Sequence, residues 1–122
     1  MARLKLLLVP AVLISALLLP MTSASADLPN KIRAHIRLTH VFRSGTDLTA
    51  RGKAIYTNNR PHKNAVVSCE VELHEKVSGT FIGQVEVTRH VPADSTRVTK
   101  WTIEGTSSTS DVIAHRHNCH LV

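Results

Sequence analysis

The chain has 122 residues, of which 43% are hydrophobic and 3% aromatic, and its 15 Lys and Arg outnumber its 9 Asp and Glu, giving a formal charge of +6. This length suits one domain with a modest core, and so few aromatic side chains argue against nucleic-acid binding by base stacking. The sequence also lacks a Gly-x-Ser-x-Gly elbow, a phosphate-binding glycine loop and a His-Glu-x-x-His motif, so we expect no enzymatic activity.

Residues 1–26 have the order of a secretory signal peptide. Arg3 and Lys5 precede an apolar run, and the small-residue sequence Ala-Ser-Ala follows at 24–26. Prolines and a serine interrupt the run, which is shorter than the roughly 20 apolar residues that a membrane span needs. We therefore predict cleavage and export, leaving one domain at 27–122 without a transmembrane segment, either free outside the cell, in a periplasm or on the cell wall.

Residues 32–42 alternate apolar side chains with basic and polar ones, which predicts a half-buried strand. Phe42 continues its apolar row after an interruption at His40. A turn at 43–47 leads to residues 48–57, which alternate in the same way. If the two strands form a hairpin, their polar sides combine into one basic sheet face carrying Arg33, Arg37, Arg51 and Lys53.

Four more strands are expected, at residues 65–75, 81–91, 96–103 and 112–122. In the predicted strand at residues 96–103, Trp101 and Ile103 share the inner face. Val and Thr dominate, and the apolar spacing of a helix is absent. Six strands in about 90 residues predict an all-β, antiparallel, immunoglobulin-like β-sandwich of about six to seven strands, although Trp101 does not occupy the position that the immunoglobulin family gives its tryptophan.

Cys69 and Cys119 are the only cysteines, and Cys69 falls on the apolar side of its strand. In an exported chain they are most simply a disulfide. It would join the last strand to the "VSCEV" strand. By reducing the entropy of the unfolded chain, the bond would stabilise the fold by on the order of 4 kcal/mol.

The closing stretch "HRHNCHLV" also suggests a metal site. Strict strand alternation places His115, His117 and Cys119 on one face with Ile113 and Leu121. Two imidazoles and a thiolate suit zinc or copper, but a cysteine in a disulfide supplies no thiolate. The alternatives are thus a closing strand with partly exposed histidines, or a metal site using His115, His117 and His120, joined by Cys119 only if it is reduced.

The stretch "GKAIYTNNRPHKNAVVSCEVELHEKVSGTFIG", followed by "VPADSTRVTKWTI", resembles the bacterial FxLYD-type domains and their immunoglobulin-like relatives. The resemblance covers residues 50–103. It consists of a glycine-led strand with an Asn turn, a Val-rich strand, a glycine-containing hairpin and a final aromatic strand. "ELHE" stands where the family has its Leu-Tyr-Asp signature, and the cysteine pair is additional. The chain is also similar to small secreted two-cysteine β proteins of high-GC Gram-positive bacteria. Both resemblances imply binding or interaction, without catalytic residues.

We therefore expect a secreted, non-enzymatic binding module whose basic face contacts a protein or an anionic cell-surface polymer. The alternative is an extracytoplasmic metal-binding protein that uses the C-terminal cluster. We expect no nucleic-acid partner, and the sequence leaves the oligomeric state open.

Overall fold

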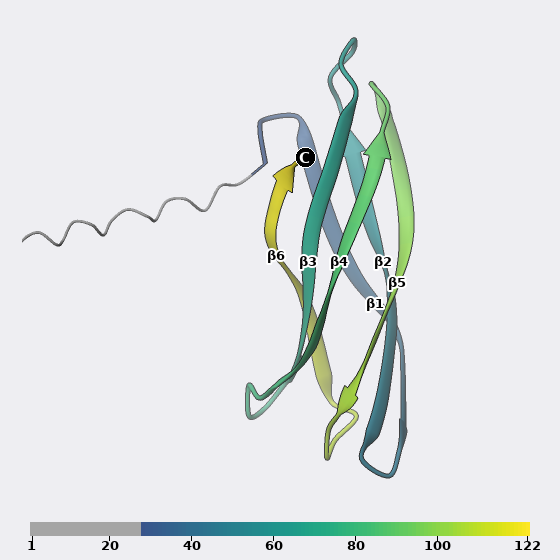
Figure 1. The fold of residues 1–122 in the computed structure, drawn as a ribbon, viewed down its shortest axis with the longest axis vertical. Coiled ribbons are helices and arrows are strands. Elements are labelled where there is room, and N and C mark those ends of the chain that lie inside the picture. Colours follow the sequence, from purple (N-terminus) through teal and green to yellow (C-terminus); the bar gives the residue numbers. More distant parts are fainter. Residues whose placement is uncertain (1–27) are drawn as a thin grey trace, which may run out of the picture.

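A computed structural model describes residues 28–122, which form six antiparallel strands in two three-stranded sheets (Figure 1). The strands are β1 (Ile32–Ser44), β2 (Asp47–Asn58), β3 (Ala65–Glu75), β4 (Phe81–Val91), β5 (Ser95–Thr106) and β6 (Val112–Leu121). The signal peptide predicted at residues 1–26 lies outside the described residues. Among the residues described, no helix is long and apolar enough to span a membrane.

The strand orders are β1-β2-β5 in one sheet and β4-β3-β6 in the other, so β2 and β3 are the central strands. The sheets pack face to face, with β4 against β5 and β2, and β1 against β6. The predicted all-β sandwich of six antiparallel strands is confirmed. Period-two alternation explains it, because each strand turns one row of small or apolar side chains toward the other sheet.

The core consists of these inward rows. In β2 every second residue from Leu48 to Asn58 is buried, and β3 buries the alternate residues from Ala65 to Leu73. Trp101 and Ile103 of β5 are buried as predicted, while Val98 points outward with 48% of its surface exposed. Gly52 faces the Trp101 ring so closely that a Cβ there would collide with the ring and with the Arg37 carbonyl, which explains a glycine in a central strand.

Two polar side chains tie the sheets together. The fully buried Tyr56 of β2 donates its hydroxyl to the Val87 carbonyl of β4 at 2.6 Å. Asn58, also buried in β2, donates to the Val91 carbonyl of β4 at 3.2 Å and to the Lys63 carbonyl at 2.8 Å. Because buried polar groups are costly without partners, these bonds fix how β2 and β4 meet.

Three register shifts interrupt the alternation that the sequence pattern takes to be continuous, one of them at Ile82 of β4, and the other two change the face of a predicted side chain. In β1 the pairing with β2 slips between Leu38 and His40. Val41 therefore takes the inward position, and Phe42, predicted to continue the apolar row, is 61% exposed. An extra residue in one strand moves every later side chain to the opposite face, which explains the error at Phe42.

The second bulge lies at Asn118 in β6. His117 pairs with Glu70 and His120 with Ser68, so Asn118 and Cys119 together face Cys69. Asn118 takes a left-handed φ of 55°, a conformation that asparagine tolerates better than most residues. The predicted common face of His115, His117 and Cys119 is therefore wrong, because Cys119 is buried and both histidines are exposed.

The buried cysteines form the predicted disulfide. Cys69 and Cys119 are bonded, with their Cα atoms 4.1 Å apart, and they join neighbouring strands of one sheet. The immunoglobulin disulfide instead joins the two sheets across the core. The bond here anchors the C-terminal strand β6, which pairs with β3 alone.

We predict that replacing Cys69 and Cys119 together with Ser lowers the free energy of unfolding by about 4 kcal/mol, because a loop closed over 50 residues no longer restricts the unfolded chain. Urea unfolding of the oxidised protein and of the double variant measures the difference. Equal unfolding midpoints would show that the bond contributes nothing to stability.

We also predict that stability declines as pH rises from about 10 to 12. Burial raises the pKa of Tyr56 to about 12, whereas the phenol of an unfolded chain ionises near 10. Above pH 10 the unfolded chain releases this proton first, so unfolding is favoured; below pH 10 both states keep it and the effect vanishes. Urea unfolding against pH should show this decline in the native protein and a smaller one in Tyr56→Phe. Identical pH profiles would contradict it.

Candidate functional site

The outward sides of the two sheets differ in charge. The β1-β2-β5 sheet presents cations, and the outward side of the β4-β3-β6 sheet combines carboxylates with imidazoles. This division follows from strand order, because the basic first part of the chain supplies β1 and β2 to one sheet while the acidic β3 belongs to the other. Each outer side is a candidate site.

The first candidate, here called the basic face, contains all four basic residues that the sequence predicts, together with Lys100 of β5. All five side chains are exposed. Lys100 escaped prediction because the sequence does not reveal that β5 pairs with β2. The basic face consists of Arg33, Arg37, Arg51, Lys53 and Lys100.

Three of these cations form a row across the sheet. Arg37 pairs directly with Lys53, and Lys53 pairs directly with Lys100. Neighbouring strands lie about 4.8 Å apart, so three positive charges occupy a band roughly 10 Å wide at their backbone attachment points. Like charges placed directly opposite each other destabilise a sheet. This row contains two such pairs, Arg37 with Lys53 and Lys53 with Lys100.

The cations of the basic face have no carboxylate partner. Every ion pair in the described part of the chain joins a histidine to Glu72, on the other sheet. The strand register also places two carboxylates on the outward side of β1-β2-β5: Asp47 beside the β1–β2 turn, and Glu104 opposite Thr49, one outward position beyond Arg51, although neither forms an ion pair with a cation of the basic face. A hollow of about 490 Å³ is lined by Arg51, Lys53 and Lys100. The basic face therefore offers unpaired positive charge around a shallow depression.

The second candidate, here called the histidine face, is the outward side of β4-β3-β6. Strand register brings Glu72 of β3 opposite His115 of β6, and Glu70 opposite His117. On the other flank, β4 places Glu86 opposite Glu70. The histidines of this face are His74, His90, His115, His117 and His120.

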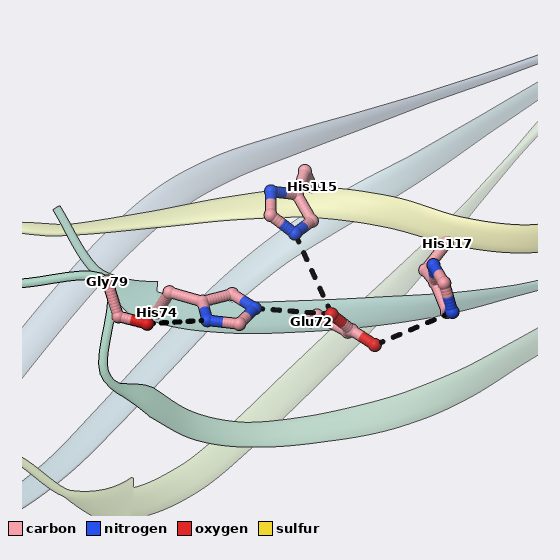
Figure 2. A network of polar contacts seen from close by, with 5 residues as sticks. All are labelled: Glu72, His74, Gly79, His115 and His117. Atoms are coloured by element: carbon pink, nitrogen blue, oxygen red, sulfur yellow. Dashed lines mark hydrogen bonds and ion pairs between the residues drawn. The ribbon is translucent and has the colours of Figure 1, made fainter.

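Glu72 is the centre of this face (Figure 2). Its Oε1 lies 3.2 Å from Nε2 of His74 and 3.7 Å from Nε2 of His115, and its Oε2 lies 3.9 Å from Nε2 of His117. The hydrogen bond with His74 lowers the pKa of the Glu72 carboxyl most; partial burial opposes this, and the charges of the three histidines add to the lowering. Glu72 is thus an ionised carboxylate facing three imidazoles.

His74 is held in place on its other side. Its Nδ1 lies 3.2 Å from the Gly79 carbonyl oxygen in the β3–β4 turn. Its ring meets Phe81 edge to face at 5.5 Å and lies 5.0 Å from the His115 ring. Three contacts therefore orient Nε2 toward Glu72.

Of the metal ligands that the sequence suggests, the structure brings His115 and His117 to one carboxylate. His120 lies further along the strand opposite Ser68, with Nδ1 3.0 Å from the Asn118 carbonyl. Cys119 points into the core and is oxidised, so it has no thiolate to offer. Glu72 and His74 were not among the site residues predicted from the sequence. Their shared side of β3 was visible, but its pairing with β6 was not.

No family model matches this chain, and comparison with curated proteins and with solved structures finds no match either. The two outer faces are therefore the basis for any functional proposal.

We predict that Asn118→Val destabilises the protein by about 1–3 kcal/mol, because a β-branched residue resists the left-handed conformation. Asn118→Gly, the matched control, should stay within a few tenths of a kcal/mol of the native protein, since glycine adopts this φ freely. Chemical denaturation of the oxidised variants distinguishes the two. If Val were tolerated as well as Gly, β6 would not need this bulge.

Proposed function

We propose that this protein is an exported, non-enzymatic binding module whose basic face contacts an anionic polymer of the cell surface. The partner carries repeated phosphate or carboxylate groups, which guanidinium and ammonium groups recognise through charge-assisted hydrogen bonds. The resemblance to FxLYD-type and immunoglobulin-like secreted domains supports a binding role, and the signal-peptide pattern supports a location outside the cytoplasm.

The row formed by Arg37, Lys53 and Lys100 carries this proposal. Basic residues on edge strands commonly prevent sheets from aggregating. That explanation suits β1 and β5 but not Lys53, which lies on the central strand β2 with neighbours on both sides. A central cation between two others costs stability, and an anion bound across the row would offset that cost.

The geometry also favours a polymer over a small anion. The cations are exposed and spread over three strands around an open hollow, and no charged side chain that lines it is buried around a single anion. Such a surface gains affinity by contacting several charges at once, and salt screens those contacts.

We predict that Arg37→Glu, Lys53→Glu and Lys100→Glu together weaken binding to long-chain polyphosphate or poly-glutamate by roughly tenfold or more. This is about 1.4 kcal/mol, a modest total for three reversed exposed charges. Binding should be measured by fluorescence anisotropy at two salt concentrations, and the native affinity should fall as salt rises.

A matched control changes the same net charge elsewhere. Lys63, Lys76 and Arg43 are exposed and lie outside the basic face, so their replacement by Glu should leave most of the affinity. Equal losses in both triple variants would attribute binding to net charge alone. Failure of the native protein to bind either polymer would remove this class of partner.

A further inference from the structure

On the opposite side of the sandwich, we infer that Glu72, His74 and His115 form a binding site for a zinc-class divalent transition-metal ion. These three residues offer ligand atoms that lie within 4.8 Å of one another. The site is independent of the proposed polymer-binding function, because it belongs to the other sheet and shares no residue with the basic face.

The distances match those expected around such an ion. Zinc binds imidazole nitrogen and carboxylate oxygen at about 2.0–2.2 Å in a tetrahedral arrangement, which separates neighbouring ligand atoms by about 3.3–3.5 Å. Oε1 of Glu72 lies 3.2 Å from Nε2 of His74 and 3.7 Å from Nε2 of His115. Two of the three separations are thus already within about 0.4 Å of the tetrahedral values, and all three ligand atoms lie within 4.8 Å of one another.

The second contact of His74 supports a ligand role. Metal-binding histidines usually donate their other ring N–H to a carbonyl or carboxylate, which fixes the tautomer. His74 has this arrangement, with Nδ1 at the Gly79 carbonyl and Nε2 turned to Glu72 (Figure 2). When Nδ1 donates to Gly79, a neutral ring presents a lone pair at Nε2 to the carboxylate oxygen. A lone pair and a carboxylate oxygen repel each other. The short distance becomes favourable when Nε2 is protonated or when a metal ion lies between Nε2 and the carboxylate.

His117 and Glu70 enlarge the donor set. They form a second potential group with Glu72, in which His117 approaches the other carboxylate oxygen at 3.9 Å. Glu72 belongs to both groups, so an ion held by Glu72, His74 and His115 has a nearby imidazole or a water for its fourth position. Imidazole donors favour zinc, copper or nickel over calcium and magnesium, which prefer sites made of oxygen.

The fold keeps the site assembled and accessible. Glu72 and His74 come from β3 and His115 from β6, and the Cys69–Cys119 bond holds these two strands in register. The His115 side chain is 53% exposed, whereas Glu72 and His74 are near 20%. An ion can therefore enter from solvent without unfolding, which makes this a site that exchanges its metal with the medium.

The test is calorimetric titration of the oxidised, metal-free protein with zinc chloride, with native mass spectrometry to count bound ions. We expect one zinc ion per chain, and a loss of affinity of roughly tenfold or more in each of Glu72→Gln, His74→Ala and His115→Ala. Glu72→Gln keeps the side-chain volume, so its effect does not depend on altered packing. Circular dichroism verifies that each variant is folded.

His90→Ala and His120→Ala are matched controls, because both histidines lie on the same face outside the proposed ligand set. Zinc binding should survive in both. Failure of the native protein to bind one equivalent would overturn the inference. So would losses in the controls as large as that in His115→Ala, which would indicate diffuse affinity of the whole histidine face.

Nitrogen NMR of the imidazoles supplies a second readout. Zinc should shift the Nε2 resonances of His74 and His115 and leave that of His90 in place; unshifted His74 and His115 would overturn the site. The variant Arg37→Glu, Lys53→Glu, Lys100→Glu should retain zinc binding, and Glu72→Gln should retain polymer binding, so each proposal can fail without the other.

Discussion

The left-handed backbone at Asn118 determines which side chains of β6 point inward and which point outward. Both the core and the histidine face depend on this conformation. Before this residue the outward row contains His115 and His117; after it the inward row contains Cys119. Without the extra residue, Cys119 would share the outward side of the histidines and could not reach Cys69 in the core. One backbone conformation therefore separates a structural cysteine from potential metal ligands only two positions away.

Strand order has the same importance for charge. The chain supplies β1 and β2 to one sheet and then β3 and β4 to the other, and β5 returns to the first with Lys100. Cations consequently gather on one outer side, with no carboxylate partner among the described residues, while Glu70 and Glu72 meet histidines on the other. The sandwich thus has one cationic outer surface and one outer surface of carboxylates and imidazoles. A core of small and apolar side chains separates the two. Interactions on one face are expected to leave the other unaffected.

Much of the fold could be predicted from the sequence, because period-two alternation and turn residues are local signals. They located all six strands, the inward Trp101 and Ile103, and the buried Cys69. The bulges could not be predicted, since each depends on pairing with another strand. Phe42 was therefore assigned to the inward row, and His115 and His117 were assigned to the face of Cys119. The site residues divide in the same way. Arg37 and Lys53 follow from neighbouring strands in a hairpin, but Lys100, Glu72 and His74 gain their meaning only from partners distant in sequence.

The two halves of "HRHNCHLV" have separate roles: Cys119 closes the core, whereas His115 faces outward and is, in our proposal, a ligand of a metal ion. A crystal structure of the oxidised protein soaked in zinc, with anomalous data at the zinc edge, tests this most directly. We expect a single strong peak between Glu72, His74 and His115, and an intact Cys69–Cys119 bond on the inner side of the same sheet. A peak at the Cys119 sulfur, or an ordered crystal with no peak beside Glu72, would contradict it.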